Sequence, residues 1–226
     1  MWIRVDVHPL IVARSITGAR ELRLEKAISD LQWIQERIHN SERVNCFRPV
    51  MISMVGCIAL LAGALQPYAA DRSVSEPWNF FFYWVSIASF VLLLVGMQIG
   101  WRYWFRAGDR ERWQAKQSLL DFAPCVMVGG IFSVALMLTA AERASLLPAF
   151  WSACFALGIF SLRHRLPEAM LLAAGFYMLA SIVCLQVSTS DTPFTPWTVG
   201  MTFGIGHFLT AGILYWYERN KYAISE

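Results

Sequence analysis

Charged residues are scarce in this sequence, and their absence from the long apolar runs already excludes several kinds of protein. Only 15% of the 226 residues are charged, whereas a soluble domain usually carries about 25%. None of the apolar runs has a carboxylate near its middle. Carboxylates within membrane spans commonly mark ion pathways and proton relays. Their absence argues against a typical proton- or sodium-coupled carrier.

Motifs of soluble enzymes and metal sites are also missing. The sequence contains no GxGxxG, P-loop, HExxH or GxSxG motif. Its five cysteines show no paired spacing, so we expect neither a disulfide framework nor a zinc site. The net charge of +3 is too small to argue for nucleic-acid binding. We therefore expect a protein that is not an enzyme and that holds no metal or cofactor.

Apolar residues, at 57% of the chain, instead form six long runs. Each run is about 20 residues long, which as a helix crosses roughly 30 Å of hydrocarbon. The sequence predicts an all-α polytopic membrane helix bundle with an N-terminal segment over 1–48, a transmembrane domain over 49–218 and a tail over 219–226. The predicted spans are 50–69, 78–100, 119–140, 144–162, 167–187 and 196–217.

The basic residues predict the orientation of these spans. Seventeen of the 19 Lys and Arg residues lie in the N-terminal segment, the second and fourth loops and the C-terminal tail. The positive-inside rule then places both termini in the cytoplasm, and we expect the bacterial inner membrane. Aromatic residues gather at both ends of the spans, as interfacial belts do. The predicted outer belt contains Trp78, Tyr83, Trp84 and Trp197. We also expect a turn at Gln66-Pro67, near the end of the first span.

Two polar segments are candidates for contacts outside the spans. Residues 19–45 carry apolar side chains three or four positions apart, which predicts a cytoplasmic amphipathic helix that could bind a protein partner. Residues 101–118 interleave Arg and Lys with Trp and Phe, which is typical of a solvated loop touching anionic headgroups.

His207 is the most conspicuous polar residue within the spans, because it lies near the middle of the sixth. With Thr202 and Thr210 around it, the imidazole could relay a proton, bind a metal or line a polar cavity. The alternative is a buried histidine that is hydrogen-bonded to a neighbouring helix and fixes how the helices dock. Asp121 begins the third span, where a helix N-terminus would favour a carboxylate.

Glycines at a spacing of four predict close contacts between helices. Gly96 and Gly100 form one GxxxG motif, Gly200 and Gly204 form another, and Gly206 lies two residues after Gly204. Small residues let helix backbones approach each other in a membrane, within one chain or in a homo-oligomer. The alternative for the sixth span is an interrupted helix of the kind that transporters use to bind substrate.

Three segments carry a resemblance to a known group of proteins. They are residues 30–37 (DLQWIQER), 146–151 (LLPAFW) and 203–207 (FGIGH). In these segments the chain resembles uncharacterised bacterial six-span membrane proteins, which are often encoded beside a winged-helix transcriptional regulator. It departs from them at Thr202 and in ending without a glycine-rich basic tail. The resemblance implies the six-span topology but no activity.

Two functions from different classes fit these features. The first is a non-enzymatic sensor, regulator or assembly module with a cytoplasmic partner. The second is a small transporter or channel with its pathway near His207. A dry, close-packed environment around this histidine favours the module, whereas a water-accessible cavity favours transport.

Overall fold

The computed structural model describes Lys26, residues 28–31, 48–69, 77–105, 108–189, Thr195 and residues 197–223. The chain divides into two units, Met1–Arg43 and Val44–Glu226. In the first unit the described residues are helical, as expected for part of the predicted amphipathic helix. The rest of that helix, over 19–45, lies outside the described residues.

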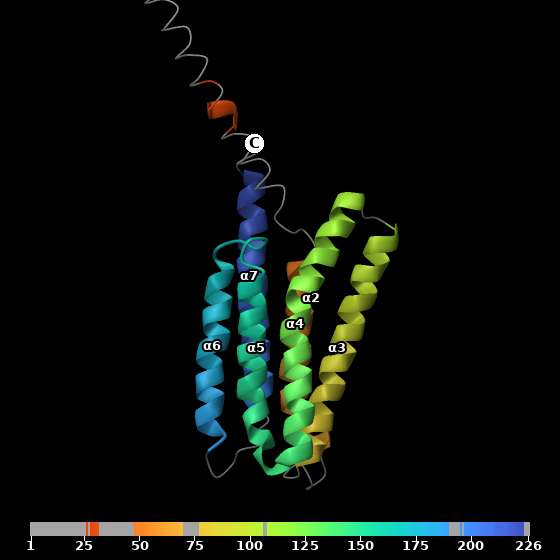
Figure 1. The fold of residues 1–226 in the computed structure, drawn as a ribbon, viewed down its shortest axis with the longest axis vertical. Helices are drawn as coiled ribbons and strands as arrows, with labels where there is room; N and C mark the ends of the chain where they lie inside the picture. The colour runs from red at the N-terminus through yellow and green to blue at the C-terminus, as the bar shows by residue number, and fades with distance from the viewer. Residues whose placement is uncertain are drawn as a thin grey trace, which may run out of the picture. The chain divides into compact units, whose positions relative to one another are not determined.

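Six α-helices and one short 3-10 helix, with no strand, make up the described part of the second unit. Hydrocarbon offers no hydrogen bonds to a backbone, so a membrane span has to satisfy its own N–H and C=O groups as a helix does. Six helical stretches are long and apolar enough to cross a membrane, which confirms the predicted fold class. The elements are α2 (Pro49–Ala69), α3 (Pro77–Phe105), α4 (Asp109–Thr139), η1 (Ala141–Leu146), α5 (Leu147–Ser161), α6 (Met170–Val187) and α7 (Trp197–Ala223) (Figure 1).

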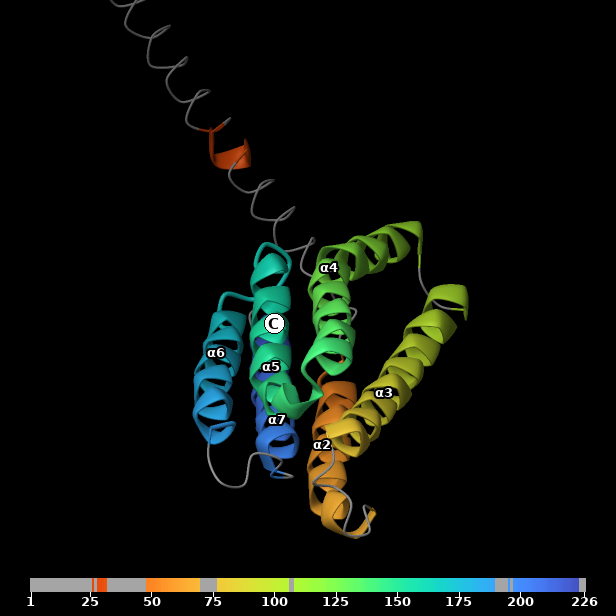
Figure 2. The same ribbon diagram turned by 60° about the horizontal axis from the view of Figure 1, so that its bottom comes forward.

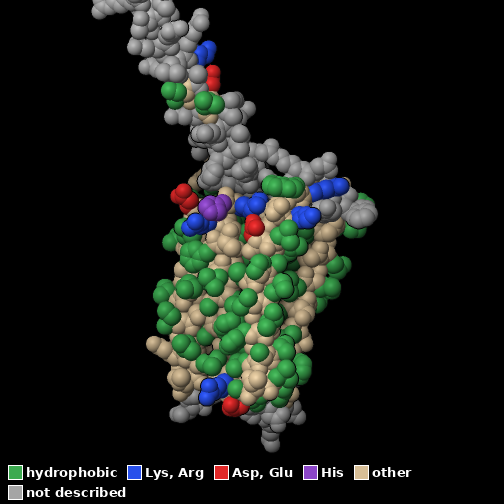
Figure 3. Space-filling model, in the orientation of Figure 1, with side chains coloured by type: hydrophobic (Ala, Val, Ile, Leu, Met, Phe, Trp, Pro, Cys, Tyr) green, Lys and Arg blue, Asp and Glu red, His purple; other side chains and the backbone are tan. Residues whose placement is uncertain are grey.

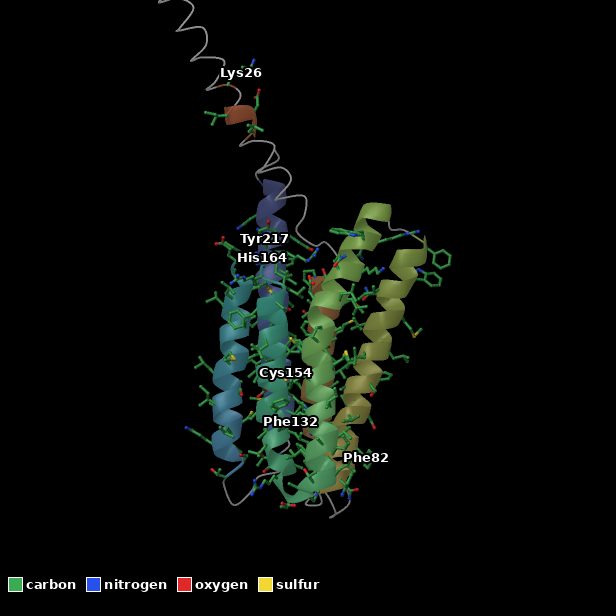
Figure 4. All side chains as sticks on the ribbon, viewed as in Figure 1. Lys26, Phe82, Phe132, Cys154, His164 and Tyr217 are labelled. Carbon is green, nitrogen blue, oxygen red and sulfur yellow. The ribbon has the colours of Figure 1, made fainter. Side chains whose placement is uncertain are left out.

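Two helix pairs form the compact part of the bundle. Helix α2 packs along α7, helix α5 packs along α6, and a contact between α6 and α7 joins the pairs. Helix α4 packs against α5, where Phe132 stacks on Phe150 with ring centroids 3.9 Å apart (Figure 4). The core therefore lies between α5, α6 and α7, with α2 and α4 on its sides.

Helix α3 is attached to the bundle mainly at one end. Its buried residues are Phe80, Phe81 and Trp84, all in its first turns, and none of its described side chains beyond Ile87 is buried. Figure 2 shows α3 and α4 diverging toward the turn that joins them, with α4 bent. Pro124 lies inside α4, and a proline that interrupts the helical hydrogen bonds is a common cause of such a bend. We call residues 88–105 of α3 and 109–117 of α4 the arm.

Described basic residues gather at one end of the bundle, which we call the basic end (Figure 3). This end carries the starts of α2 and α4 and the ends of α3, α5 and α7. The Lys and Arg residues at this end whose side chains the structure describes are Arg48, Arg112, Lys116, Arg163, Arg165 and Arg219, whereas among the described side chains of the opposite end there is Arg143. The cytoplasmic location of the basic end remains a prediction.

The segment over 101–118 differs from the solvated loop that we expected. Helix α3 continues to Phe105 and α4 begins at Asp109, so three residues separate them. Hydropathy falls where the charges begin, but Arg, Lys, Gln and Ala all favour a helix, and Gly108 is the only strong helix breaker in the segment. The basic and aromatic side chains therefore belong to two helix ends.

Part of the predicted outer belt is also wrong. Trp78 and Trp197 are exposed, as residues of a belt should be, but Trp84 is only 3% exposed. Gln66 and Pro67 lie inside α2 and form no turn there. The polar atoms of Trp84 and Gln66 face each other between helices, so that neither side chain is available to the membrane interface.

Candidate functional site

His207 is the eleventh residue of α7 and lies among aromatic side chains. Its imidazole is partly buried, with the Phe155 ring of α5 5.3 Å away between centroids and the Phe203 ring 6.2 Å away. The Tyr177 ring of α6 approaches it edge-on. Tyr177 is itself fully buried and lies 4.8 Å from Phe155 between centroids. Three helices thus enclose the histidine with rings.

The hydrogen bonds at Nδ1 determine which nitrogen carries the proton in the neutral ring. Nδ1 lies 2.6 Å from the carbonyl oxygen of Phe203 and 3.0 Å from the hydroxyl oxygen of Tyr177. A carbonyl oxygen can only accept, so Nδ1 must donate to it and therefore bears the hydrogen. Nε2 is then the acceptor of the ring, and no described residue forms a hydrogen bond with it.

Gly206 makes room for this contact. A Cβ atom at position 206 would overlap the ring and hydroxyl of Tyr177. A larger residue here would push Tyr177 away from α7 and break its approach to His207. The glycine before the histidine is therefore explained by the tyrosine that occupies its side-chain space, and the helix continues through it without interruption.

The two threonines predicted beside His207 have other partners. Thr202 is buried, and its hydroxyl lies 3.5 Å from the Cys184 thiol of α6. The hydroxyl of Thr210 donates to the carbonyl oxygen of Gly206, 2.8 Å away in its own helix. Neither threonine hydrogen-bonds to His207. Thr202 links α7 to α6, whereas Thr210 satisfies its hydroxyl within α7.

A second buried polar contact lies nearer the opposite end, between α2 and α3. The indole N–H of Trp84 donates to Oε1 of Gln66 at 3.0 Å, and the Tyr83 hydroxyl donates to the carbonyl of Ala62 at 2.6 Å. An indole nitrogen can only donate, so the amide oxygen must face it and the amide NH₂ must point away. Gln66 is fully buried, and its Nε2 has no hydrogen-bond partner among the described residues.

The two GxxxG motifs differ in what surrounds them. A Cβ atom at Gly200 would lie 2.8 Å from the Cα atom of Gly63, and one at Gly204 would lie 2.5 Å from the Leu60 side chain. Both glycines therefore face α2 in close backbone contact. At Gly96 and Gly100 an added Cβ would meet no described atom within 4 Å. This second motif makes no helix contact within the described chain.

Asp121 does not lie at a helix N-terminus, because α4 begins twelve residues earlier. Its carboxylate instead accepts a hydrogen bond from Nε of Arg165 at 3.0 Å, and Arg165 lies over the Trp113 ring. Its backbone carbonyl accepts from the Ser161 hydroxyl at 3.0 Å. The macrodipole explanation is therefore wrong for Asp121, whose carboxylate links α4 to the turn after α5.

Sequence reasoning missed Tyr177 and Gln66. A tyrosine near the middle of a span is far from the interface where its hydroxyl would find water, so it requires a polar partner in the bundle. The sequence therefore contained a signal for Tyr177. Gln66 was missed because the Gln66-Pro67 pair was interpreted as a turn.

Among the described residues no group of three or more His, Cys, Asp or Glu side chains could hold a metal ion. No known family model, curated protein or solved structure matches this chain.

Proposed function

We propose that this chain is a non-enzymatic membrane module, a sensor, regulator or assembly partner, and not a carrier of solutes. The observation that carries the proposal is how the polar side chains within the spans are used. The imidazole of His207 is enclosed by rings, and its Nδ1 is engaged by a carbonyl and a hydroxyl. Gln66, Trp84 and Thr202 likewise make contacts between helices.

Such contacts stabilise a fixed arrangement of helices. Hydrogen bonds between membrane helices contribute about 0.6–2 kcal/mol each, and close glycine contacts add van der Waals attraction. A bundle built this way suits a rigid scaffold better than a pathway, which needs polar groups left open to water or solute. The arm is the part that the bundle buries least, so we propose it as a surface for partners, together with the amphipathic helix predicted over 19–45.

One observation favours the alternative of a small transporter or channel. Nε2 of His207 is an acceptor without a hydrogen bond to any described residue. If water or a solute reached this atom, the histidine could act as a relay or a binding position. The two functions therefore differ in a single measurable property, the access of water to position 207.

Cysteine accessibility measures that property directly. We would introduce His207→Cys into a variant whose five natural cysteines are replaced, and treat membranes with a charged, water-soluble methanethiosulfonate reagent. The module predicts no labelling at position 207 and full labelling of a Lys116→Cys control, which is exposed at the basic end. Fast labelling at 207 that a bulky substitution nearby abolishes would refute the module and favour transport.

The proposal also covers which side of the membrane the basic end faces and which part of the chain binds a partner. We propose that the basic end faces the cytoplasm of a bacterial cell, because Lys and Arg near the ends of spans are retained on that side. A pull-down in mild detergent, with and without residues 1–45, tests whether the N-terminal segment binds a soluble protein.

A further inference from the structure

Helix α4 loses the support of α5 close to the point where its own hydrogen bonding is interrupted. The two helices run antiparallel, and the hydroxyl of Ser161, the last residue of α5, donates to the backbone carbonyl of Asp121 at 3.0 Å. Residues of α4 before Asp121 therefore extend past the end of α5. Pro124 lacks the N–H that would bond to the carbonyl of Leu120. The end of α5 and the missing hydrogen bond thus coincide along α4, which is bent (Figure 2).

The turn after α5 reaches across this part of α4. Nε of Arg165 donates to the Asp121 carboxylate at 3.0 Å, and its guanidinium carbon lies 5.8 Å from the centroid of the Trp113 ring. Trp113 precedes Asp121 by eight residues, roughly 12 Å along the helix, and belongs to the arm. No described side chain over 109–117 is buried. We call Asp121, Arg165 and Trp113 the clamp, because one guanidinium contacts α4 at two separate places.

We propose that the clamp holds the arm in place, and that the arm swings about the bend near Pro124 when the clamp opens. A planar guanidinium suits this position because it can pair with a carboxylate while its face lies over an aromatic ring. The side chains of Arg165 and Asp121 are 24% and 37% exposed, so salt screens their ion pair. The Phe132–Phe150 stack, which holds α4 to α5 beyond the bend, is apolar and does not depend on salt. The clamp is therefore a charge-controlled conformational device.

The inference goes beyond the proposed function, since it applies to a module and to a transporter alike. Its consequence is largest for a module, because the clamp then sets how the arm is presented to a partner. The helix α3 half of the arm can follow such a movement. Three residues separate α3 from α4, and the buried residues of α3 lie in its first turns, at the far end from the arm.

The arm is long enough for a small rotation to be measured. Gly108 precedes Asp121 by thirteen residues, roughly 20 Å along the helix axis. A rotation of about 20° at the bend, the size of a sharp helix kink, would move Gly108 by roughly 7 Å. A shift of this size is readily detected as a change in the distance between two spin labels.

Double electron–electron resonance on the full chain in lipid nanodiscs would test the clamp. Labels would be attached at Gly108→Cys and Leu172→Cys in a variant without the five natural cysteines. Both positions are exposed, and an added Cβ at position 108 meets no described atom within 4 Å. We expect a narrow distance distribution that Arg165→Gln and Asp121→Asn broaden or shift by up to roughly 7 Å. High salt should move the unsubstituted clamp toward the same distribution and leave the two variants unchanged.

Control variants separate the clamp from a general loosening of the bundle. Arg143→Gln removes an exposed charge at the opposite end, and Gly200→Ala perturbs the contact of α7 with α2. Neither should change the measured distance. Trp113→Ala should broaden the distribution, whereas Trp113→Phe keeps an aromatic face and should not. An unchanged distribution in both Arg165→Gln and Asp121→Asn, or equal broadening in Arg143→Gln, would overturn the inference.

Discussion

Replacing Gly200 by alanine should destabilise the bundle, whereas the same change at Gly96 should not. Both residues belong to GxxxG motifs in apolar helices. The added Cβ at position 200 would lie 2.8 Å from the Cα atom of Gly63 and 3.2 Å from the carbonyl oxygen of Ala59. Both neighbours are backbone atoms of α2, so no side chain can rotate away. At Gly96 the added Cβ meets no described atom within 4 Å.

The size of the effect follows from this geometry. Carbon atoms in contact prefer about 3.5–4.0 Å, so α2 and α7 would have to separate locally by roughly 0.7–1.2 Å. Forcing an extra methyl group into a close-packed core typically costs about 1–3 kcal/mol. Alanine also favours a helix over glycine by about 1 kcal/mol, but this gain is common to both variants and cancels between them. We therefore expect Gly200→Ala to be less stable than Gly96→Ala by about 1–3 kcal/mol.

Reversible unfolding in mixed micelles with increasing SDS would measure the difference, with circular dichroism and tryptophan fluorescence as independent probes. The probes should give coincident transitions, so that one free energy of unfolding describes each variant. Gly204→Ala, whose added Cβ meets the flexible Leu60 side chain, should fall between the two. Equal stability of Gly200→Ala and Gly96→Ala would refute the close contact between α2 and α7.

The other substitutions address the buried polar groups. Tyr177→Phe removes the hydroxyl 3.0 Å from Nδ1 of His207 but leaves the bond to the Phe203 carbonyl, so it should cost only about 0.6–1.7 kcal/mol in the same unfolding assay; a loss of folding would contradict the view that the Phe203 carbonyl alone can satisfy Nδ1. Gln66→Leu leaves the Trp84 N–H without its acceptor, whereas adding Trp84→Phe removes both partners. A double-mutant cycle should therefore show the double variant losing less stability than the sum of the single variants, and simple additivity would argue against their hydrogen bond.

A green fluorescent protein fused to the C-terminus should fluoresce and a fused periplasmic phosphatase should be inactive. The reverse pattern would contradict the six-span orientation.

The number of spans and the charge at their ends could be read from the sequence, because both depend on local composition. A run of about 20 apolar residues must form a helix in hydrocarbon whatever its neighbours are. Helix ends were read less well, as the long α3 and α4 show, since charges end the apolar run without ending the helix. The apolar runs therefore predicted the membrane domain but underestimated the lengths of α3 and α4.

Only the tertiary structure decided which side chains meet. These helices are apolar around their whole circumference, so no amphipathic stripe identifies the inward face. Two GxxxG motifs therefore look alike in the sequence, although Gly200 contacts α2 and Gly96 does not. For the same reason His207 could be placed at mid-span from the sequence, but its pairing with Tyr177 required the packing of α6 on α7. Depth in a membrane follows from position along one helix, whereas partnership depends on how two helices are rotated toward each other.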